Sequence, residues 1–174
     1  MKELAEKPYI LYVGNAYPHK NLERLILAFN NLIRDGFDCR LILVGEKDRF
    51  YKKLKIGGKI IPTGFISDEE LDNLYKNSAL CVFPSLCEGF GLPPLEAMKR
   101  RVPVVCSNTG SLPEILGESA VYFNPLDIDD ITEKIKMVLM DNNLIKKLVQ
   151  KGFEQVMKYS WSDMAEKTLK QYLL

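Results

Sequence analysis

Histidine is almost absent from this sequence, and its cysteines do not follow a metal-binding spacing. His19 is the single histidine, and none of the four cysteines forms a C-x-x-C pair, so a zinc site lacks its usual ligands. Three of the cysteines lie in apolar runs typical of buried strands, which favours free thiols in a reducing cytosol. The cysteines are Cys39, Cys81, Cys87 and Cys106.

Long apolar runs and an excess of charge are also missing. No stretch approaches the ~18 apolar residues of a membrane span, and the charged start MKELAEK has no apolar signal region. Lys and Arg number 24 against 23 Asp and Glu, so the net charge is only +1. Without a strong positive field we expect no nucleic-acid partner, and we expect a cytoplasmic protein.

What is present is an alternation of short apolar runs with amphipathic helical patterns. Expected strands cover residues 9–14, 39–45, 59–65, 79–85, 102–107 and 120–123, with Pro62 suggesting that the third stops early. Expected helices cover residues 22–33, 67–78, 93–101, 127–140, 143–159 and 162–174. Strands that are apolar throughout indicate a parallel sheet covered on both faces. The sequence therefore predicts one α/β domain, residues 1–174, with a doubly wound, Rossmann-like sheet of about six strands.

Sheets of this kind bind ligands in the loops beyond the carboxyl ends of their strands. One such loop opens the segment CEGFGLPPLEAM, residues 87–98. Gly89 and Gly91 let backbone N–H groups face a ligand, and Pro93 and Pro94 then begin a helix whose positive dipole end points to the same place. We expect phosphate or diphosphate oxygens to bind here.

Two glutamates flank this expected anion site. Glu88 precedes it, and Glu96, about one turn into the helix, is placed to accept hydrogen bonds from vicinal hydroxyls. One acid at a ribose and the other at the sugar being moved would suit a nucleotide sugar. The alternative is that Glu96 is a solvated acid favoured by the helix dipole and that Glu88 is an incidental loop charge.

The first loop, GNAYPHKN (residues 14–21), adds a cation. Lys20 lies at the beginning of a helix, where the dipole disfavours positive charge, unless an anion lies between the two. The alternative is a surface lysine, and His19 is interpreted as a solvated loop residue rather than a catalytic base. The loop matches neither the P-loop pattern G-x-x-x-x-G-K-[ST] nor the dinucleotide pattern G-x-G-x-x-G.

Together these segments carry a family resemblance. EGFGLPPLE resembles the E-x7-E signature of retaining glycosyltransferases with the two-domain GT-B fold, and nearly the whole chain is similar to the family-4 group. The similarity continues through the segments YVGNAYPHKNLERLILAF, LILVG, GFISDEELDNLYKNSALCVFPSLCEGFGLPPLEAM, VPVVCSNTGSLPEILGESAVYF and NPLDIDDI, in the order of the family.

The resemblance implies a role for each matching position. Glu96 would bind the donor ribose, and Glu88 would be the catalytic group beside the transferred sugar. The implied diphosphate-binding residues are Lys20, Asn15, Gly89, Phe90, Gly91, Leu92 and Ser111, and the implied nucleobase-binding residues are Phe65 and Ile66. Many relatives have an arginine where this chain has Asn15, so diphosphate binding here would depend more on Lys20. No metal or other cofactor is expected, because helix dipole, backbone N–H groups and lysine neutralise the leaving diphosphate.

The family also has an N-terminal domain that holds the acceptor, whereas only eight residues precede the first strand here. The chain is therefore expected to be the C-terminal, donor-binding half of the GT-B fold, with the acceptor domain absent. The family's last helix usually crosses to that domain, so Trp161 and Tyr172 are expected to be partly unsupported. Any membrane association would run through the absent domain.

The resemblance implies that the whole enzyme transfers a hexosyl unit from a GDP- or UDP-hexose to a glycan or lipid-linked acceptor, with retention at the anomeric carbon. Mannose is slightly favoured, and the isolated domain is expected to be inactive. Two alternatives stay open. One is a sugar-nucleotide epimerase of the same fold, and the other is a stand-alone nucleotide-sugar-binding or regulatory subunit.

Overall fold

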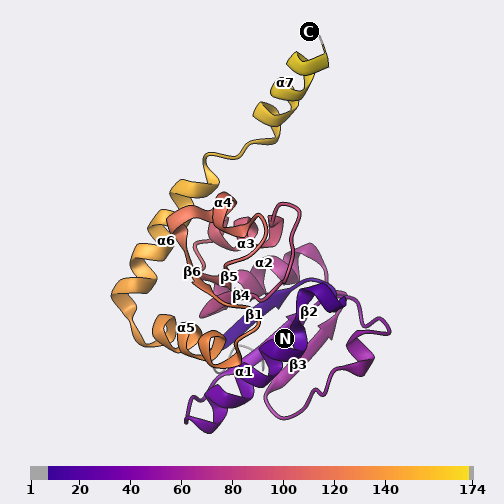
Figure 1. Ribbon diagram of the computed structural model, residues 1–174, viewed down its shortest axis with the longest axis vertical. Helices are drawn as coiled ribbons and strands as arrows, with labels where there is room; N and C mark the ends of the chain where they lie inside the picture. Colours follow the sequence, from indigo (N-terminus) through magenta and orange to yellow (C-terminus); the bar gives the residue numbers. More distant parts are fainter. Residues whose placement is uncertain (1–7, 173–174) are drawn as a thin grey trace.

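The structure, a computed structural model, describes residues 8–172 and contains one six-stranded sheet (Figure 1). Every neighbouring pair of strands is parallel, in the order β3-β2-β1-β4-β5-β6. The strands are β1 (Tyr9–Val13), β2 (Arg40–Val44), β3 (Ile60–Gly64), β4 (Leu80–Phe83), β5 (Val104–Ser107) and β6 (Ala120–Phe123). The expected doubly wound α/β fold is confirmed, and its strand order reverses between β1 and β4.

Helices connect the strands and continue beyond the last one. The α-helices are α1 (Leu22–Arg34), α2 (Asp68–Asn77), α3 (Leu92–Lys99), α4 (Leu112–Leu116), α5 (Ile128–Met140), α6 (Asn142–Val156) and α7 (Trp161–Tyr172). Short 3₁₀ turns cover Pro18–Lys20, Tyr51–Lys53 and Gly117–Ser119. The sequence patterns did not predict α4, because five residues are too few to show helical periodicity.

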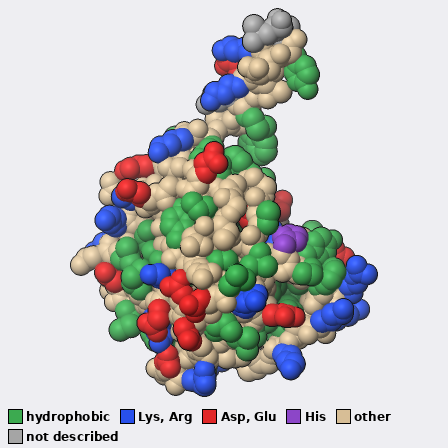
Figure 2. All heavy atoms as spheres, viewed as in Figure 1, with side chains coloured by type: hydrophobic (Ala, Val, Ile, Leu, Met, Phe, Trp, Pro, Cys, Tyr) green, Lys and Arg blue, Asp and Glu red, His purple; other side chains and the backbone are tan. Residues whose placement is uncertain are grey.

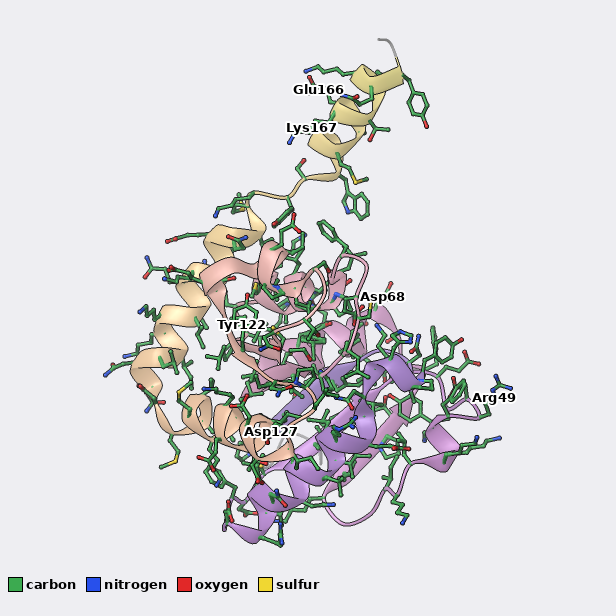
Figure 3. All side chains as sticks on the ribbon, viewed as in Figure 1. Arg49, Asp68, Tyr122, Asp127, Glu166 and Lys167 are labelled. Carbon is green, nitrogen blue, oxygen red and sulfur yellow. The ribbon has the colours of Figure 1, made fainter. Side chains whose placement is uncertain are left out.

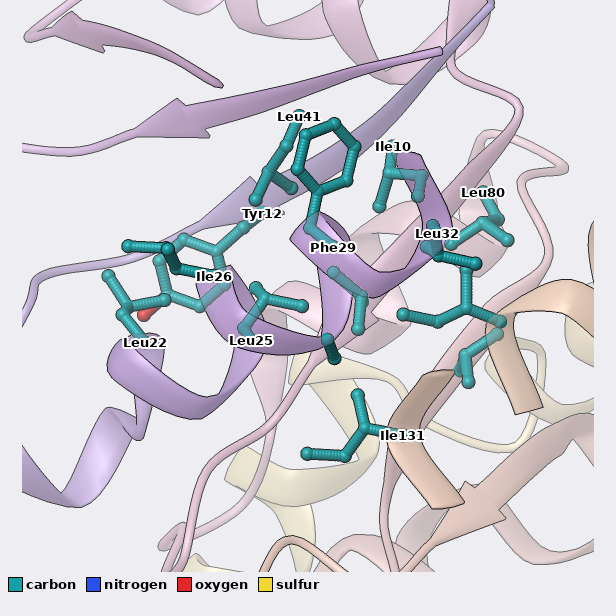
Figure 4. Packing of buried hydrophobic residues seen from close by; sticks show 14 of the residues in the cluster. Ile10, Tyr12, Leu22, Leu25, Ile26, Phe29, Leu32, Leu41, Leu80 and Ile131 are labelled. Atoms are coloured by element: carbon teal, nitrogen blue, oxygen red, sulfur yellow. The ribbon is translucent and has the colours of Figure 1, made fainter. Parts of the chain in front are cut away.

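Alternate residues of each strand enter two separate cores, one on each face of the sheet. On one face, Ile10 and Tyr12 of β1 pack with α1 and α5, as Figure 4 shows. On the other face, Tyr9 and Leu11 pack with α2, α3 and α4. Because both faces are covered, the strands are apolar throughout, which is the pattern that indicated a parallel sheet.

The expectation that Pro62 ends its strand early is wrong. β3 continues through Pro62 to Gly64, and the register against β2 shifts by one residue beside it. β3 is an edge strand, so a residue without an N–H can remain in it without removing a hydrogen bond from a central ladder.

The last two helices differ in how they contact the sheet domain. α6 lies against α3, where a Cβ at Gly152 would come within 3.0 Å of the Met98 side chain. α7 extends away from the domain in Figure 1, and its labelled Glu166 and Lys167 lie far from the sheet in Figure 3. Trp161 is 71% exposed and Tyr172 is 85% exposed, which confirms that these side chains lack support here. Within residues 8–172, no helix is both long and apolar enough to cross a bilayer.

Candidate functional site

The loops that follow β1 and β4 meet at the carboxyl edge of the sheet, where the strand order reverses. The Leu86 N–H donates to the His19 carbonyl oxygen at 2.7 Å, which fastens the second loop to the first. The buried Asn21 amide donates to the carbonyl oxygens of Pro84 at 3.0 Å and Pro125 at 2.7 Å. Three loops from distant parts of the sequence are therefore held together at this point.

Asn21 is a structural residue of the site that the sequence reasoning missed. Its φ of 58° places it in the left-handed region directly before α1, a conformation that asparagine tolerates better than most residues. Its Oδ1 accepts a hydrogen bond from Arg24 Nη1 at 2.9 Å, so both ends of the amide are used. An asparagine where an amphipathic helix begins was the available signal, although only its position in space shows which loops it joins.

Lys20 and Glu88 form an ion pair at the centre of the site. Lys20 Nζ lies 2.7 Å from Oε1 and 2.9 Å from Oε2 of Glu88, and each side chain is only 16% exposed. The residues are 68 positions apart in the sequence. The structure thus brings together the cation of the first loop and the acid that precedes the glycine-rich segment.

The loop after β5 supports the backbone of Glu88. The Ser111 hydroxyl donates to the Glu88 carbonyl oxygen at 3.1 Å, and the Thr109 hydroxyl donates to the Ser85 carbonyl oxygen at 3.2 Å. Gly110 has a φ of 62°, and a Cβ there would lie 3.2 Å from the Glu88 nitrogen. Ser111 therefore lies beside Glu88 and supports its main chain.

The glycine-rich segment leads directly into α3. Gly91 precedes the helix with a φ of 90°, a left-handed conformation that favours glycine, and a Cβ there would displace the end of the Leu112 side chain, 2.8 Å away. At Gly89, a Cβ would meet no atom of residues 8–172 within 4 Å, which leaves that side of the backbone open.

The helix end is a weaker anion site than the sequence suggested. α3 begins at Leu92, one residue before the expected start, so the two prolines occupy its second and third positions. Neither Pro93 nor Pro94 has an N–H to offer. The backbone donors at this end are therefore those of residues 89–92, together with the dipole of the helix.

Glu96 lies one turn further along α3 with its side chain exposed. The Tyr75 hydroxyl donates to its Oε2 at 3.3 Å. Glu96 thus accepts a hydrogen bond from Tyr75 on α2, whereas Glu88 is paired with Lys20. The two glutamates of the segment therefore have different environments.

The other expected site residues on these loops make contacts of their own. Asn15 uses its Oδ1 to accept from the Tyr17 N–H at 3.2 Å, which closes a turn in the first loop. The Phe65 side chain is 91% exposed at the end of β3, and Ile66 beside it packs on the core under α2 and α3. Phe90 lies edge-on to Tyr159, with the ring centroids 5.5 Å apart.

A shallow hollow lies beside the first loop. Its lining comes from Tyr17, Pro18 and His19 on one side and from Asp48, Arg49 and Phe50 on the other. The single histidine, purple in Figure 2, is one of its lining residues, and Arg49, labelled in Figure 3, is another. Among residues 8–172, no three His, Cys, Asp or Glu side chains lie close enough together to hold a metal ion.

Comparison with solved structures places this fold among the glycosyltransferases. The sucrose-phosphate synthase of Thermosynechococcus elongatus matches with a TM-score of 0.82 and 27% identity, over 97% of this chain and 45% of that one. The C-terminal domain of a glycosyl transferase group 1 family protein (LpcC) from Francisella tularensis matches with a TM-score of 0.79 and 27% identity, over 90% and 88% of the two chains. The GT-B resemblance expected from the sequence is thereby confirmed.

The sequence model described as "Glycosyl transferases group 1" matches residues 2–155, and the chain belongs to this family. The O-antigen chain mannosyltransferase B of Escherichia coli is 37% identical over 180 residues, which cover 99% of this chain and 47% of that protein. The serotype-specific mannosyltransferase WbdA of Escherichia coli is 35% identical over 90% of this chain and 20% of its own length. The chain thus spans less than half the length of either relative and corresponds to a C-terminal part.

Proposed function

We propose that this chain is the donor-binding domain of a retaining hexosyltransferase that uses a GDP- or UDP-hexose, with mannose favoured. The names of the two Escherichia coli relatives, both mannosyltransferases, support the choice of sugar. The greater length of those relatives leaves room for an N-terminal domain that would hold a glycan or lipid-linked acceptor. On this proposal, the isolated chain binds donor but transfers no sugar, because nothing aligns an acceptor nucleophile.

The observation that carries the proposal is the Lys20–Glu88 ion pair beside the open glycine-rich loop, at the point where the strand order reverses. A lysine ammonium and the N–H groups of residues 89–92 are donors that suit the diphosphate of a nucleotide sugar. A carboxylate next to them suits the positive charge that develops on the sugar when the diphosphate leaves. Asn15 and Ser111 lie on the two neighbouring loops and complete the proposed diphosphate site.

The proposed chemistry needs no metal ion. Lys20 and the backbone donors would neutralise the charge that develops on the leaving diphosphate. The diphosphate oxygen would take the proton of the acceptor hydroxyl on the face that it leaves, so that the anomeric configuration is retained. Glu88 would stabilise the sugar through its charge and need not form a covalent bond to it.

Glu96 is proposed to bind the ribose hydroxyls of the same donor. Its exposed carboxylate lies one turn beyond the proposed diphosphate loop, on the same helix. Phe65 and Ile66 follow β3 at the same edge of the sheet, and the almost fully exposed Phe65 ring offers a surface to a nucleobase. In this proposal Glu88 lies beside the sugar, Glu96 binds the ribose, and Phe65 and Ile66 lie at the nucleobase.

Calorimetric titration of the chain with GDP, UDP and ADP tests the proposal. We expect one of them to bind, and we expect Lys20→Ala to weaken the diphosphate far more than the corresponding nucleoside, because only the phosphates face the lysine. Lys146→Ala removes the same charge from the exposed surface of α6 and serves as the matched control. The proposal is wrong if no nucleoside diphosphate binds, or if Lys20→Ala weakens nucleoside and diphosphate by the same factor.

A further inference from the structure

Tyr75 connects the buried core under α2 to the exposed carboxylate of Glu96. The tyrosine ring is completely buried, yet its hydroxyl reaches the surface of α3 and donates to Glu96 Oε2 at 3.3 Å. The two residues lie 21 positions apart, on consecutive helices of the same sheet face. An exposed glutamate is therefore hydrogen-bonded to a side chain that is fully buried in the core.

Arg100 holds this arrangement from the other side. Its Nε donates to Asp72 Oδ1 on α2 at 2.7 Å, and its Nη1 donates to the Glu96 carbonyl oxygen at 3.1 Å. Its guanidinium carbon also lies 4.9 Å from the centroid of the Tyr75 ring. Arg100 thus ties α3 to α2 while covering the ring that carries the donor hydroxyl.

In this pair the Tyr75 hydroxyl is the hydrogen-bond donor and the Glu96 carboxylate is the acceptor. Burial, the largest cause, raises the pKa of Tyr75 well above its usual value, so the hydroxyl keeps its proton in the physiological range. A carboxylate offers about four lone-pair sites on two oxygens, and the tyrosine occupies one of them on Oε2. The other oxygen stays available to a ligand.

We propose that Tyr75, braced by Arg100, is a positioning residue that holds the Glu96 carboxylate in the orientation required for the two vicinal hydroxyls of a ribose. The inference rests on the proposed function, because it assumes that Glu96 binds the ribose. A free glutamate loses rotamer entropy when a ligand fixes it, and a preformed orientation reduces that cost. The benefit would appear only with ligands that carry the hydroxyls.

The test compares a nucleoside diphosphate with its 2′,3′-dideoxy form, using whichever of GDP and UDP binds more tightly. Tyr75→Phe removes the hydroxyl and keeps the ring, its packing and its contact with Arg100. Tyr9→Phe is the matched control, because Tyr9 is buried in the same core and donates to the Leu74 carbonyl oxygen at 2.7 Å, without contacting Glu96. The measured quantity in each variant is the affinity for the nucleoside diphosphate divided by the affinity for its 2′,3′-dideoxy form. The melting temperature of each variant is recorded as well.

We expect the ratio to fall about threefold to tenfold in Tyr75→Phe and to stay at the wild-type value in Tyr9→Phe. Arg100→Lys, which keeps the charge and loses the fork that bridges the helices, should lower the ratio as well. If the ratio is unchanged in Tyr75→Phe but falls to about one in Glu96→Ala, the inference is wrong and the proposed function stands. An unchanged ratio in Glu96→Ala overturns both the ribose role and the inference.

Discussion

Replacing Glu88 with glutamine should make the chain bind a nucleoside diphosphate more tightly. In the ligand-free structure both oxygens of Glu88 hold Lys20 Nζ, at 2.7 and 2.9 Å. If Lys20 is also the cation for the diphosphate, the ligand has to compete with that carboxylate and also meets its negative charge. Glutamine keeps nearly the same shape and removes the competing charge. The Ser111 bond is unaffected, because it is made to the Glu88 backbone oxygen.

The size of the effect follows from the burial and geometry of the pair. Two unit charges about 4 Å apart attract by about 4 kcal/mol at an effective dielectric of about 20. Desolvation and the ordering of two long side chains remove most of that energy, and exposed pairs retain about 1 kcal/mol or less. With each side chain 16% exposed, we take about 1 kcal/mol as the part that the diphosphate must overcome. The expected gain is therefore about fivefold in affinity at low salt.

The assay is calorimetric titration of four forms of the chain: wild type, Glu88→Gln, Lys20→Ala and the double variant. If the gain comes through Lys20, it disappears when Lys20 is already alanine, so the cycle isolates the pairwise effect. Glu114→Gln, an equal change of charge at an exposed position on α4, is the control: it measures how much the affinity rises when any negative charge is removed. A gain that persists in the Lys20→Ala background, or an affinity that falls in Glu88→Gln, would refute the competition.

Two further predictions concern stability and thiol chemistry. Asn21→Ala should lower the free energy of unfolding by about 3 kcal/mol in urea denaturation, because two buried carbonyl oxygens lose their donor and alanine is strained at a φ of 58°; a loss below about 1 kcal/mol would show that water replaces the amide. Ellman's reagent at pH 8 should titrate one fast thiol per native chain and none in Cys87→Ser, because Cys87 is exposed and Cys39, Cys81 and Cys106 are buried. Burial raises the pKa of Cys81 to about 12, so its reactive thiolate forms only as the pH rises toward that value, and a second fast thiol at pH 8 would contradict this.

Much of the fold was predictable because its signals are local. Short apolar runs predicted all six strands to within two residues at each end, and the capping box at Ser67 and Glu70 located the start of α2. The sequence around β3 does not show that this strand lies at the edge of the sheet, and for that reason Pro62 was wrongly expected to end it. A proline interrupts a strand only where its missing N–H is needed, which depends on neighbours that the sequence does not name.

The site was predictable in its residues but less so in its contacts. A cation at a helix start is stabilised by a nearby anion, and for Lys20 the chain itself supplies one, the Glu88 carboxylate. That carboxylate satisfies the requirement without any ligand, so the helix dipole by itself no longer demands a diphosphate. The case for a diphosphate then depends on whether a ligand can replace Glu88 at Lys20. A buried ion pair often stabilises a fold no more than apolar side chains of similar size would. Because Lys20 and Glu88 are largely buried, their pairing does not by itself explain in terms of stability why two charged residues lie here. A ligand that uses both charges would explain a cation and an acid at the reversal point of the sheet, and the Lys20 and Glu88 double-variant cycle tests for it.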